Sequence, residues 1–387
     1  MTVPLHIRFT HAEVLRPEGV SDDPLTLADG LVVEDAPGAR DVALPEHILL
    51  PGIVDLHGDA FERQLAPRRG AAANKALGLR AVEAELAASG ITTAWLAQFY
   101  SWEGGMRGPD FAEQLAEALA HYRGEALIDM RLQLRFEMSM LEDYARFEAL
   151  AKGSIADYVV FNDHLPHEAL AAGKRPPRLT GSALKARRSP EDHLSLQQRL
   201  HGGMSGVPAA VTGLAGQLAQ VGIALGSHDD ATVEDRARFA RSGIAISEFP
   251  LTAEVARHAR DTDAAVIMGA PNVVRGGSHK SAVSATDLVR DGLVNALVSD
   301  YHYPALPQAA LTLVDREGLS LAAAWSLIST GPAEIMGLTD RGTLSPGHRA
   351  DFVALHRETR RIEGCFCAGR AAYLSGAFTA ALIAGAP

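Results

Sequence analysis

The stretch LLPGIVDLHGDAFE, residues 49–62, begins as a buried strand and ends in polar side chains. Its apolar residues between Leu49 and Leu56 favour a β-strand that packs inside a core. The run then closes on His57 and Asp59, an imidazole and a carboxylate two positions apart. Because strand residues two apart point to the same side, both side chains can face one rim. The pattern indicates a fold whose functional groups gather at strand ends.

The fold class follows from how often this pattern recurs. Eight short apolar runs alternate with alanine-rich stretches that have helical patterning. Such alternation predicts an α/β protein with a (β/α)8 TIM-like barrel. The alternative, an open doubly wound sheet, would carry a glycine-rich phosphate turn after its first strand, and none occurs there. The expected strands are residues 52–56, 91–98, 131–136, 157–162, 222–227, 243–249, 264–270 and 296–300, and the expected helices include 75–89, 110–122, 209–221, 231–242 and 284–292.

The two ends of the chain differ from its middle. Residues 1–50 and 341–387 contain short alternating pieces separated by Pro, Gly and Asp turns, a pattern typical of antiparallel sheet. We expect these ends to pair into one small, β-sandwich-like domain beside the barrel, which would take residues 51–340. Within the barrel, residues 173–193 are basic and rich in turn formers, so we expect a mobile loop there.

The composition excludes several classes of function. Apolar residues make up 47% of the 387 residues, enough for a large core, but no stretch approaches the length of a membrane span. The N-terminus lacks the basic start and apolar run of a secretion signal, so we expect a cytoplasmic protein. The two cysteines, Cys365 and Cys367, alternate on an expected strand, which suits neither a disulfide nor a metal clip. The net charge of −11 argues against a broad nucleic-acid surface, and an anionic substrate would need a metal or a local basic patch.

Histidines and carboxylates follow five of the expected strands. In a barrel the loops after the strands converge on one mouth, so these groups would meet there. Clustered charges would repel one another without a cation, and zinc binds imidazole nitrogen together with carboxylate oxygen. The sequence therefore predicts a site for one or two divalent ions, zinc first, with manganese or iron as alternatives. The residues concerned are His57, Asp59, Glu137, His164, His228 and Asp300.

Two basic segments accompany the expected strand ends. MGAPNVVRGGSHKSAV, residues 268–283, follows a strand and places Arg275, His279 and Lys280 around a Gly-Gly pair. Glycines let backbone N–H groups approach an anion closely and the cations add charge, so phosphate binding is one interpretation. An ordinary flexible turn is the other. FERQLAPRRG, residues 61–70, adds Arg68, which could face a long anion or water.

Several of these motifs together resemble one enzyme family. They are the His-x-Asp after the first strand, SHDDAT at 227–232, EFP at 248–250, MGAPNVVRGGSH at 268–279 and SDY at 299–301. The set resembles the α-D-ribose 1-methylphosphonate 5-triphosphate diphosphatases of the carbon–phosphorus lyase pathway, within the amidohydrolase superfamily. LPGIVDLH near the start and GTLSPGHRADFVAL near the end resemble the way that superfamily frames its barrel, so the resemblance spans almost the whole chain.

The resemblance implies a role for each candidate residue. The His-x-Asp pair matches the metal positions after the first strand, although the broader superfamily usually has His-x-His there. Glu137 matches a carboxylate that bridges metals, and His164 and His228 match the later histidine ligands. Asp300 matches the aspartate of the last strand that accepts a proton from water.

The resemblance also implies an activity. It is that of a metal-dependent hydrolase that cleaves a ribose-linked triphosphate to the 5-phosphate and pyrophosphate, with Asp300 as general base. Arg275, His279, Lys280 and Arg68 would hold the phosphate chain. The partner is then a small phosphorylated sugar, not nucleic acid or a membrane, and barrels of this kind often form homo-oligomers. Two alternatives stay open: the same metal site acting on a cyclic amide, an N-acyl amine or an amino-heterocycle, and a non-catalytic barrel that serves as a scaffold.

Overall fold

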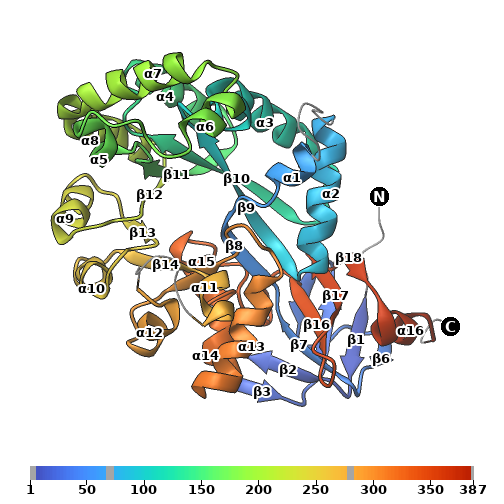
Figure 1. The fold of residues 1–387 in the computed structure, drawn as a ribbon. Coiled ribbons are helices and arrows are strands. Elements are labelled where there is room, and N and C mark those ends of the chain that lie inside the picture. The colour runs from blue at the N-terminus through green and yellow to red at the C-terminus, as the bar shows by residue number, and fades with distance from the viewer. Residues whose placement is uncertain (1–5, 67–73, 277–282, 385–387) are drawn as a thin grey trace. The chain divides into compact units, whose positions relative to one another are not determined.

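The computed structural model describes residues 6–66, 74–276 and 283–384 (Figure 1). These residues form two compact units. The first, called the terminal unit, comprises the described residues of Met1–Trp95, Tyr122–Met130 and Ile267–Pro387. The second, called the middle unit, comprises Leu96–His121 and Arg131–Val266.

Eight parallel strands, β8 to β15, form one sheet in which the order of the strands follows the order of the chain. Each strand expected from an apolar run is present, so the (β/α)8 fold is confirmed and the open doubly wound sheet is wrong. After β15, a single parallel bridge pairs Asp300 with Gly58 at the end of β8, which brings the last strand back to the first. The strands are β8 (Ile53–Gly58), β9 (Ile91–Tyr100), β10 (Asp129–Glu137), β11 (Ala156–Asn162), β12 (Ala224–His228), β13 (Ile246–Glu248), β14 (Ala265–Gly269) and β15 (Ala296–Val298).

Helices follow the strands, and several begin where the sequence supplies a capping side chain. Asn74, Ser189, Thr232 and Ser284 each accept a hydrogen bond from a backbone N–H in the first turn of the next helix. Among the described residues, no helix has both the length and the apolar character needed to cross a membrane. The helices are α1 (Glu62–Leu65), α2 (Lys75–Ala88), α3 (Pro109–Tyr122), α4 (Tyr144–Gly153), α5 (His167–Ala171), α6 (Leu179–Lys185), α7 (Pro190–Gly202), α8 (Val207–Ala219), α9 (Val233–Arg241), α10 (Ala253–Asp261), α11 (Ala270–Arg275), α12 (Ala285–Arg290), α13 (Ala305–Glu317), α14 (Leu321–Ser326), α15 (Thr330–Ile335) and α16 (Gly376–Ala384), with short 3-10 turns at Gly105–Arg107, Leu141–Asp143 and Met204–Gly206.

The two ends of the chain share a six-stranded sheet in the terminal unit. β7 (His47–Pro51) pairs antiparallel with β16 (Phe352–His356) in the strand order β18-β17-β16-β7-β2-β3. A second sheet, β5-β4-β1-β6, comes from the N-terminal segment alone. The expected β-domain of N- and C-terminal segments is therefore confirmed, while its boundaries at residues 50 and 341 stay a prediction. The remaining strands are β1 (Ile7–Thr10), β2 (Glu13–Arg16), β3 (Gly19–Ser21), β4 (Leu25–Ala28), β5 (Leu31–Val33), β6 (Arg40–Ala43), β17 (Ile362–Cys367) and β18 (Arg370–Leu374).

An aromatic core holds the β-domain together. Phe9, Phe352, Phe366 and Phe378 are all fully buried. The rings of Phe352 and Phe366 stack with their centroids 4.6 Å apart, and Phe9 meets Phe352 edge-on at 5.4 Å. Burying one such side chain stabilises a fold by about 1.5–3 kcal/mol. Because these rings come from both ends of the chain, their packing ties the C-terminal segment to the N-terminal one.

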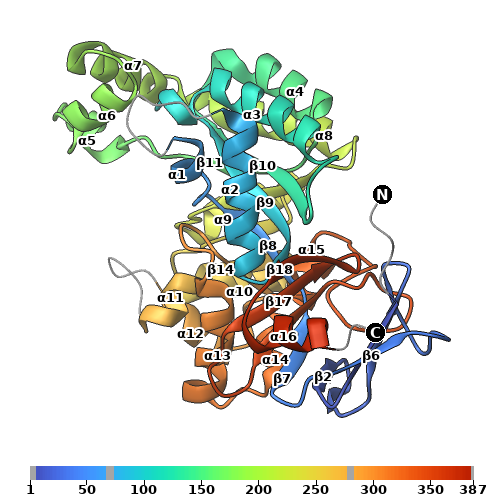
Figure 2. The ribbon, with the colours of Figure 1, turned by 90° about the vertical axis from the view of Figure 1, so that its right-hand side faces the viewer.

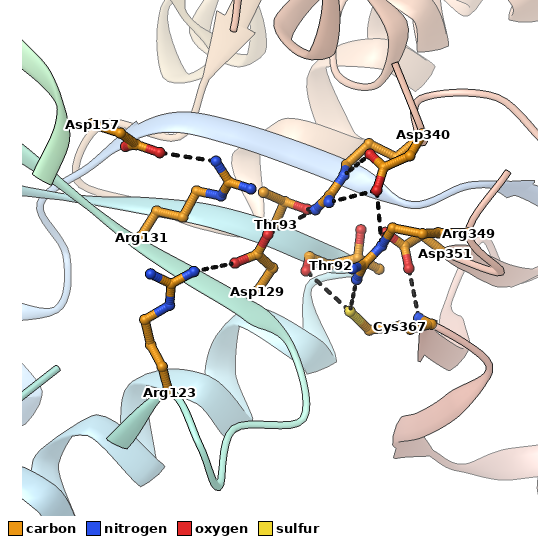
Figure 3. Close-up of polar contacts among 12 residues, drawn as sticks. Thr92, Thr93, Arg123, Asp129, Arg131, Asp157, Asp340, Arg349, Asp351 and Cys367 are labelled. Carbon is orange, nitrogen blue, oxygen red and sulfur yellow. Dashed lines mark hydrogen bonds and ion pairs between the residues drawn. The ribbon is translucent and has the colours of Figure 1, made fainter. Parts of the chain in front are cut away.

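Arginine–aspartate contacts join the residues after 340 to the barrel strands inside the terminal unit (Figure 3). The guanidinium of Arg341 donates to the hydroxyl of Thr93 on β9 at 2.9 Å and to the carboxylate of Asp129 on β10 at 2.8 Å. Within the C-terminal segment itself, Arg349 donates to Asp351 at 3.1 Å. Arg341 is only 7% exposed, so these bonds are shielded from water and fix the segment beside the strands.

About half of the segment 173–193 is helical, which the expectation of a loop there missed. It contains α6 and the start of α7. Ser189 caps α7 by accepting the backbone N–H of Asp192 at 3.0 Å, and Pro190 opens the helix. Serine before proline and acidic residues is a helix-start signal that the basic, turn-rich composition concealed. α5, α6 and α7 pack together within the middle unit (Figure 2).

Candidate metal centre

Three strands of the middle unit end side by side at one edge of the sheet. β10 pairs with β11, and β11 with β12, all in parallel, and Glu137 lies opposite Asn162 at the last pair of β10 and β11. His164 follows β11 by two residues, and His228 is the last residue of β12. The centroids of the two histidine rings are 5.9 Å apart. The structure thus brings together three of the residues expected to bind metal.

Glu137 and His164 form a carboxylate–imidazole pair. Glu137 is fully buried and accepts a hydrogen bond from Nδ1 of His164. It also accepts the backbone N–H of His164 at 3.1 Å and the indole N–H of Trp102 at 3.3 Å. Burial alone would raise the pKa of Glu137, but the contacts with His164 outweigh it and lower that pKa. Glu137 is therefore charged at neutral pH and directs the Nε2 atom of His164 away from itself.

His228 is held by a second buried carboxylate. Nδ1 of His228 donates to Glu248, the last residue of β13, at 3.2 Å. The other carboxylate oxygen of Glu248 accepts the side-chain N–H of Gln133 at 2.8 Å and the hydroxyl of Tyr158 at 2.7 Å. Since a hydrogen bond to Nδ1 fixes the tautomer, the lone pair of His228 lies on Nε2. A carboxylate behind a histidine is the usual support of a metal-binding imidazole.

Arg135 occupies the ligand side of His228. Its guanidinium donates to Nε2 of His228 at 3.0 Å and lies 3.9 Å from the centroid of the Phe99 ring. Burial, and then the charge of Arg135, lower the pKa of His228 to about 4. The imidazole is therefore neutral at pH 7, which is the form that binds metals. A metal on Nε2 would require the guanidinium to move aside.

His164, His228 and Asp229 together fit a divalent ion. Each offers one donor atom, and these atoms lie within 4.8 Å of one another. Nε2 of His228 is 3.9 Å from the carboxylate of Asp229. In a tetrahedral site with bonds of roughly 2.0–2.1 Å the donors are about 3.3 Å apart, so a small contraction completes the site. Two imidazoles and a carboxylate suit zinc, manganese or iron. Asp229 was not among the expected ligands.

The SHDDAT motif divides into ligands and supports. Asp230 is buried and accepts hydrogen bonds from the hydroxyls of Ser227 at 2.8 Å and Ser247 at 2.7 Å. Arg236, which is also buried, lies 3.3 Å from the same carboxylate. Thr232 caps α9. Only His228 and Asp229 of the motif's polar residues thus lie at the candidate centre, and the others fix the loop that carries them.

Three residues just past barrel strands have a left-handed backbone. They are Asp229 after β12, Phe249 after β13 and Asp300 after β15, with φ angles of 57°, 54° and 55°. Such a conformation costs a residue other than glycine of order 1–3 kcal/mol, less for aspartate, and it is concentrated at functional sites. The strain supports a functional role for these strand ends.

In the terminal unit, the end of β8 lies beside the segment after β15. The backbone N–H of Asp300 donates to the carbonyl of His57, and that of Asp59 donates to the carbonyl of Asp300, both at 2.9 Å. His57 is fully buried, whereas Asp59 lies just past the strand and is partly exposed. The structure therefore brings these three expected residues together. That they share an ion with Glu137, His164 and His228 stays a prediction.

A buried aspartate that the sequence did not single out supports this end of β8. Asp55 accepts the backbone N–H of Ser299 at 3.0 Å and its hydroxyl at 2.5 Å. Burial raises the pKa of Asp55. Gly58, which follows His57, has no room for a side chain. A Cβ there would lie 2.7 Å from the ring of Tyr303 and 2.9 Å from the carboxylate of Asp55. Glycine is therefore required between the histidine and Asp59.

Of the residues expected to bind substrate, Arg275 alone can be placed. It is the exposed last residue of α11 and donates to the hydroxyl of Tyr301 at 2.6 Å. Arg68, His279 and Lys280 lie outside the described residues. Their assignment to the phosphate chain stays a prediction.

Comparisons with known proteins identify a family match, a related enzyme and solved structures with the same fold. A family model described as "Amidohydrolase family" matches residues 207–363. The α-D-ribose 1-methylphosphonate 5-triphosphate diphosphatase of Escherichia coli (strain K12) is 33% identical over 330 residues, 81% of this chain and 84% of that protein. The N-acetylglucosamine-6-phosphate deacetylase of Pasteurella multocida has a TM-score of 0.65 at 11% identity, covering 95% of this chain and 99% of its own. The β-aspartyl dipeptidase of Fervidobacterium islandicum AW-1 has a TM-score of 0.61 at 13% identity, with 97% and 98% covered. At such identities, the two structures share only the fold.

Proposed function

The chain belongs to the amidohydrolase family and is a hydrolase; on this premise we propose that it cleaves α-D-ribose 1-methylphosphonate 5-triphosphate to the 5-phosphate and pyrophosphate. The observation that carries the proposal is the 33% identity to the E. coli diphosphatase, which extends over 81% of this chain. Matching over most of both chains means that the similarity is not confined to the barrel frame that amidohydrolases share.

The candidate centre supports a metal-dependent reaction. His164, His228 and Asp229 would hold a divalent ion, zinc first and manganese or iron as alternatives. That His57, Asp59 and Glu137 also bind metal, so that the protein holds one or two ions, stays a prediction. A bound ion supplies Lewis-acid chemistry, because it makes water acidic enough to attack at neutral pH and neutralises charge on phosphoryl oxygens.

The protein's own groups would divide the remaining work. Asp300 would accept the proton of the attacking water as general base. The water oxygen forms a bond to phosphorus, the anhydride P–O bond breaks, and pyrophosphate leaves with the electron pair. Glu137 and Glu248 would keep the two imidazoles in place during this step. Arg275, with Arg68, His279 and Lys280, would hold the phosphate chain, since the net charge of −11 repels an anion at longer range.

A direct assay separates this proposal from its alternatives. The purified protein, supplied with zinc or manganese, is incubated with the ribose triphosphate, with nucleoside triphosphates and with a panel of cyclic amides and N-acyl amines. We expect pyrophosphate release from the ribose triphosphate, its loss in His164→Ala, and no change in His121→Ala, an exposed histidine of α3. Amide hydrolysis without pyrophosphate release would favour the amidohydrolase alternative, and no turnover of any substrate would favour the scaffold. The cytoplasmic location and homo-oligomerisation stay predictions.

A further inference from the structure

A cavity lies in the middle unit. Its volume is about 410 Å³, within the usual range for small-molecule sites. The walls come from the segments that follow β9 and β10 and from the α6–α7 region, and they include Trp102, Ser139, Arg188 and Arg199. Trp102 also donates its indole N–H to Glu137, so one side chain connects this cavity with the candidate metal centre.

Two arginines line the cavity. Neither Arg188 nor Arg199 forms an ion pair with any residue in the described part of the chain. Arg188 is half-buried and donates to the backbone carbonyl of Trp102 at 2.6 Å, which fixes its position on the wall. Burial, and then the charge of Arg199, lower the pKa of Arg188, as expected for two cations that share one space. An anion between them would relieve this repulsion.

Carboxylates also line the cavity, and they do not neutralise these arginines. Glu142 is exposed to solvent, and Asp143 accepts the hydroxyl of Tyr100 at 3.2 Å. Both sit on the 3-10 turn Leu141–Asp143, at the start of α4. The cavity therefore has arginines from the α6–α7 region on one wall and the acidic residues Glu142 and Asp143 on another.

One buried polar atom at the cavity lacks a partner. Ser139 is 2% exposed, lines the cavity, and its hydroxyl has no hydrogen-bond partner among the described residues. Buried polar groups are nearly always hydrogen-bonded, and a polar molecule in the cavity would supply the partner of this hydroxyl.

We propose that this cavity binds a tetrahedral phosphorus oxyanion, a phosphonate or phosphate group of the substrate that does not react. The inference rests on the proposed function, and it assigns substrate recognition to the residues that line this cavity. Arg188 and Arg199 provide planar N–H donors that match such an anion in pairs, and the Ser139 hydroxyl adds one more donor. Arg188 belongs to the basic segment 173–193, and Arg199 lies just beyond it on α7, so the region between β11 and β12 takes a role in substrate binding.

The test compares binding and turnover in matched variants. The metal-loaded protein is titrated calorimetrically with methylphosphonate and, separately, with pyrophosphate, and KM and kcat are measured with the ribose triphosphate. Arg199→Gln changes an exposed residue that should not affect folding. Arg188→Gln and Arg188→Lys test the inner position, and Lys185→Ala removes an exposed cation of α6 that does not line the cavity. We expect the glutamine variants to lose about 10- to 100-fold in anion affinity and to raise KM similarly with little change in kcat, and Lys185→Ala to match the wild type.

Each outcome bears on one proposal. Loss of methylphosphonate affinity alone assigns the cavity to the phosphonate end of the substrate, and loss of pyrophosphate affinity alone assigns it to the phosphate chain. If the arginine variants lose anion affinity although no variant or wild type releases pyrophosphate, the cavity is supported and the proposed function fails. If the wild type hydrolyses the substrate while Arg188→Gln and Arg199→Gln keep wild-type KM and anion affinity, the inference is overturned.

Discussion

Replacing Glu248 with glutamine tests how the candidate metal centre holds His228. Glu248 is fully buried and accepts hydrogen bonds from His228 at 3.2 Å, Gln133 at 2.8 Å and Tyr158 at 2.7 Å. A glutamine keeps an oxygen for Gln133 and Tyr158, but its NH2 group would face the Nδ1–H of His228, donor against donor. The lost bond to a charged acceptor is worth about 1.5–3 kcal/mol. Because 1.4 kcal/mol is a factor of ten, we expect the affinity for zinc to fall about 10- to 100-fold.

The measurement is a competition titration of zinc between the protein and a chromophoric chelator. Glu234→Gln is the matched control, because it removes an exposed carboxylate of α9 outside the centre and should leave zinc affinity unchanged. Thermal unfolding of the chelator-treated proteins separates a loss of fold from a loss of ligand orientation. A Glu248→Gln protein that folds normally and binds zinc within about twofold of the wild type would show that Glu248 does not support His228 as a ligand, since losing such a carboxylate normally lowers metal affinity tenfold or more.

Three further perturbations have defined outcomes. Asp230→Ala leaves the buried Arg236 without its carboxylate, so the free energy of unfolding in urea should fall by about 3–5 kcal/mol. A loss below about 1 kcal/mol, which is typical of an exposed ion pair, would contradict the assignment of Asp230 and Arg236 as a buried ion pair. Gly58→Ala places a methyl group 2.7 Å from a buried tyrosine ring, so stability should fall by about 1–3 kcal/mol and hydrolysis with it; an alanine variant as stable and active as the wild type would show that the strand end has room. Burial tends to raise the pKa of Glu363, but hydrogen bonds from His47 and a backbone N–H outweigh it and lower that pKa below the ordinary 4.5. The wild type should therefore be more stable than Glu363→Gln above pH 4.5, and this difference in unfolding free energy should shrink as the pH falls through the lowered pKa. A difference that stays constant with pH would contradict this expectation.

The barrel strands could be predicted because of where they lie. A strand that is covered on both faces needs a nearly continuous apolar run, and β11 illustrates this: every residue from Tyr158 to Asn162 is buried. The residues at which the strands begin and end are harder to predict from the sequence. The run 243–249 predicted a seven-residue strand, yet β13 spans only Ile246–Glu248. It begins three residues later, after the turn at Gly243 with its φ of 76°, and it ends where Phe249 takes a left-handed φ.

The candidate centre could be predicted only in part. His228 follows from its place at the end of an apolar run, but its support by Glu248 and Gln133 does not, since Gln133 and Glu248 are 115 residues apart and meet only through the sheet. The sequence also cannot tell Asp229 from Asp230. The structure separates them, because a left-handed φ at Asp229 lets the next carboxylate turn inward to the buried arginine of α9 while Asp229 stays at the centre.

The proposed reaction requires a divalent ion at the ends of β11 and β12. A crystal structure of the zinc-loaded protein, with anomalous diffraction recorded at the zinc edge, would locate that ion. We predict an anomalous peak at roughly 2.0–2.2 Å from a nitrogen of His164 and from Nε2 of His228, with the guanidinium of Arg135 moved off that nitrogen. Zinc bound elsewhere, with Arg135 still bonded to Nε2 of His228, would contradict it.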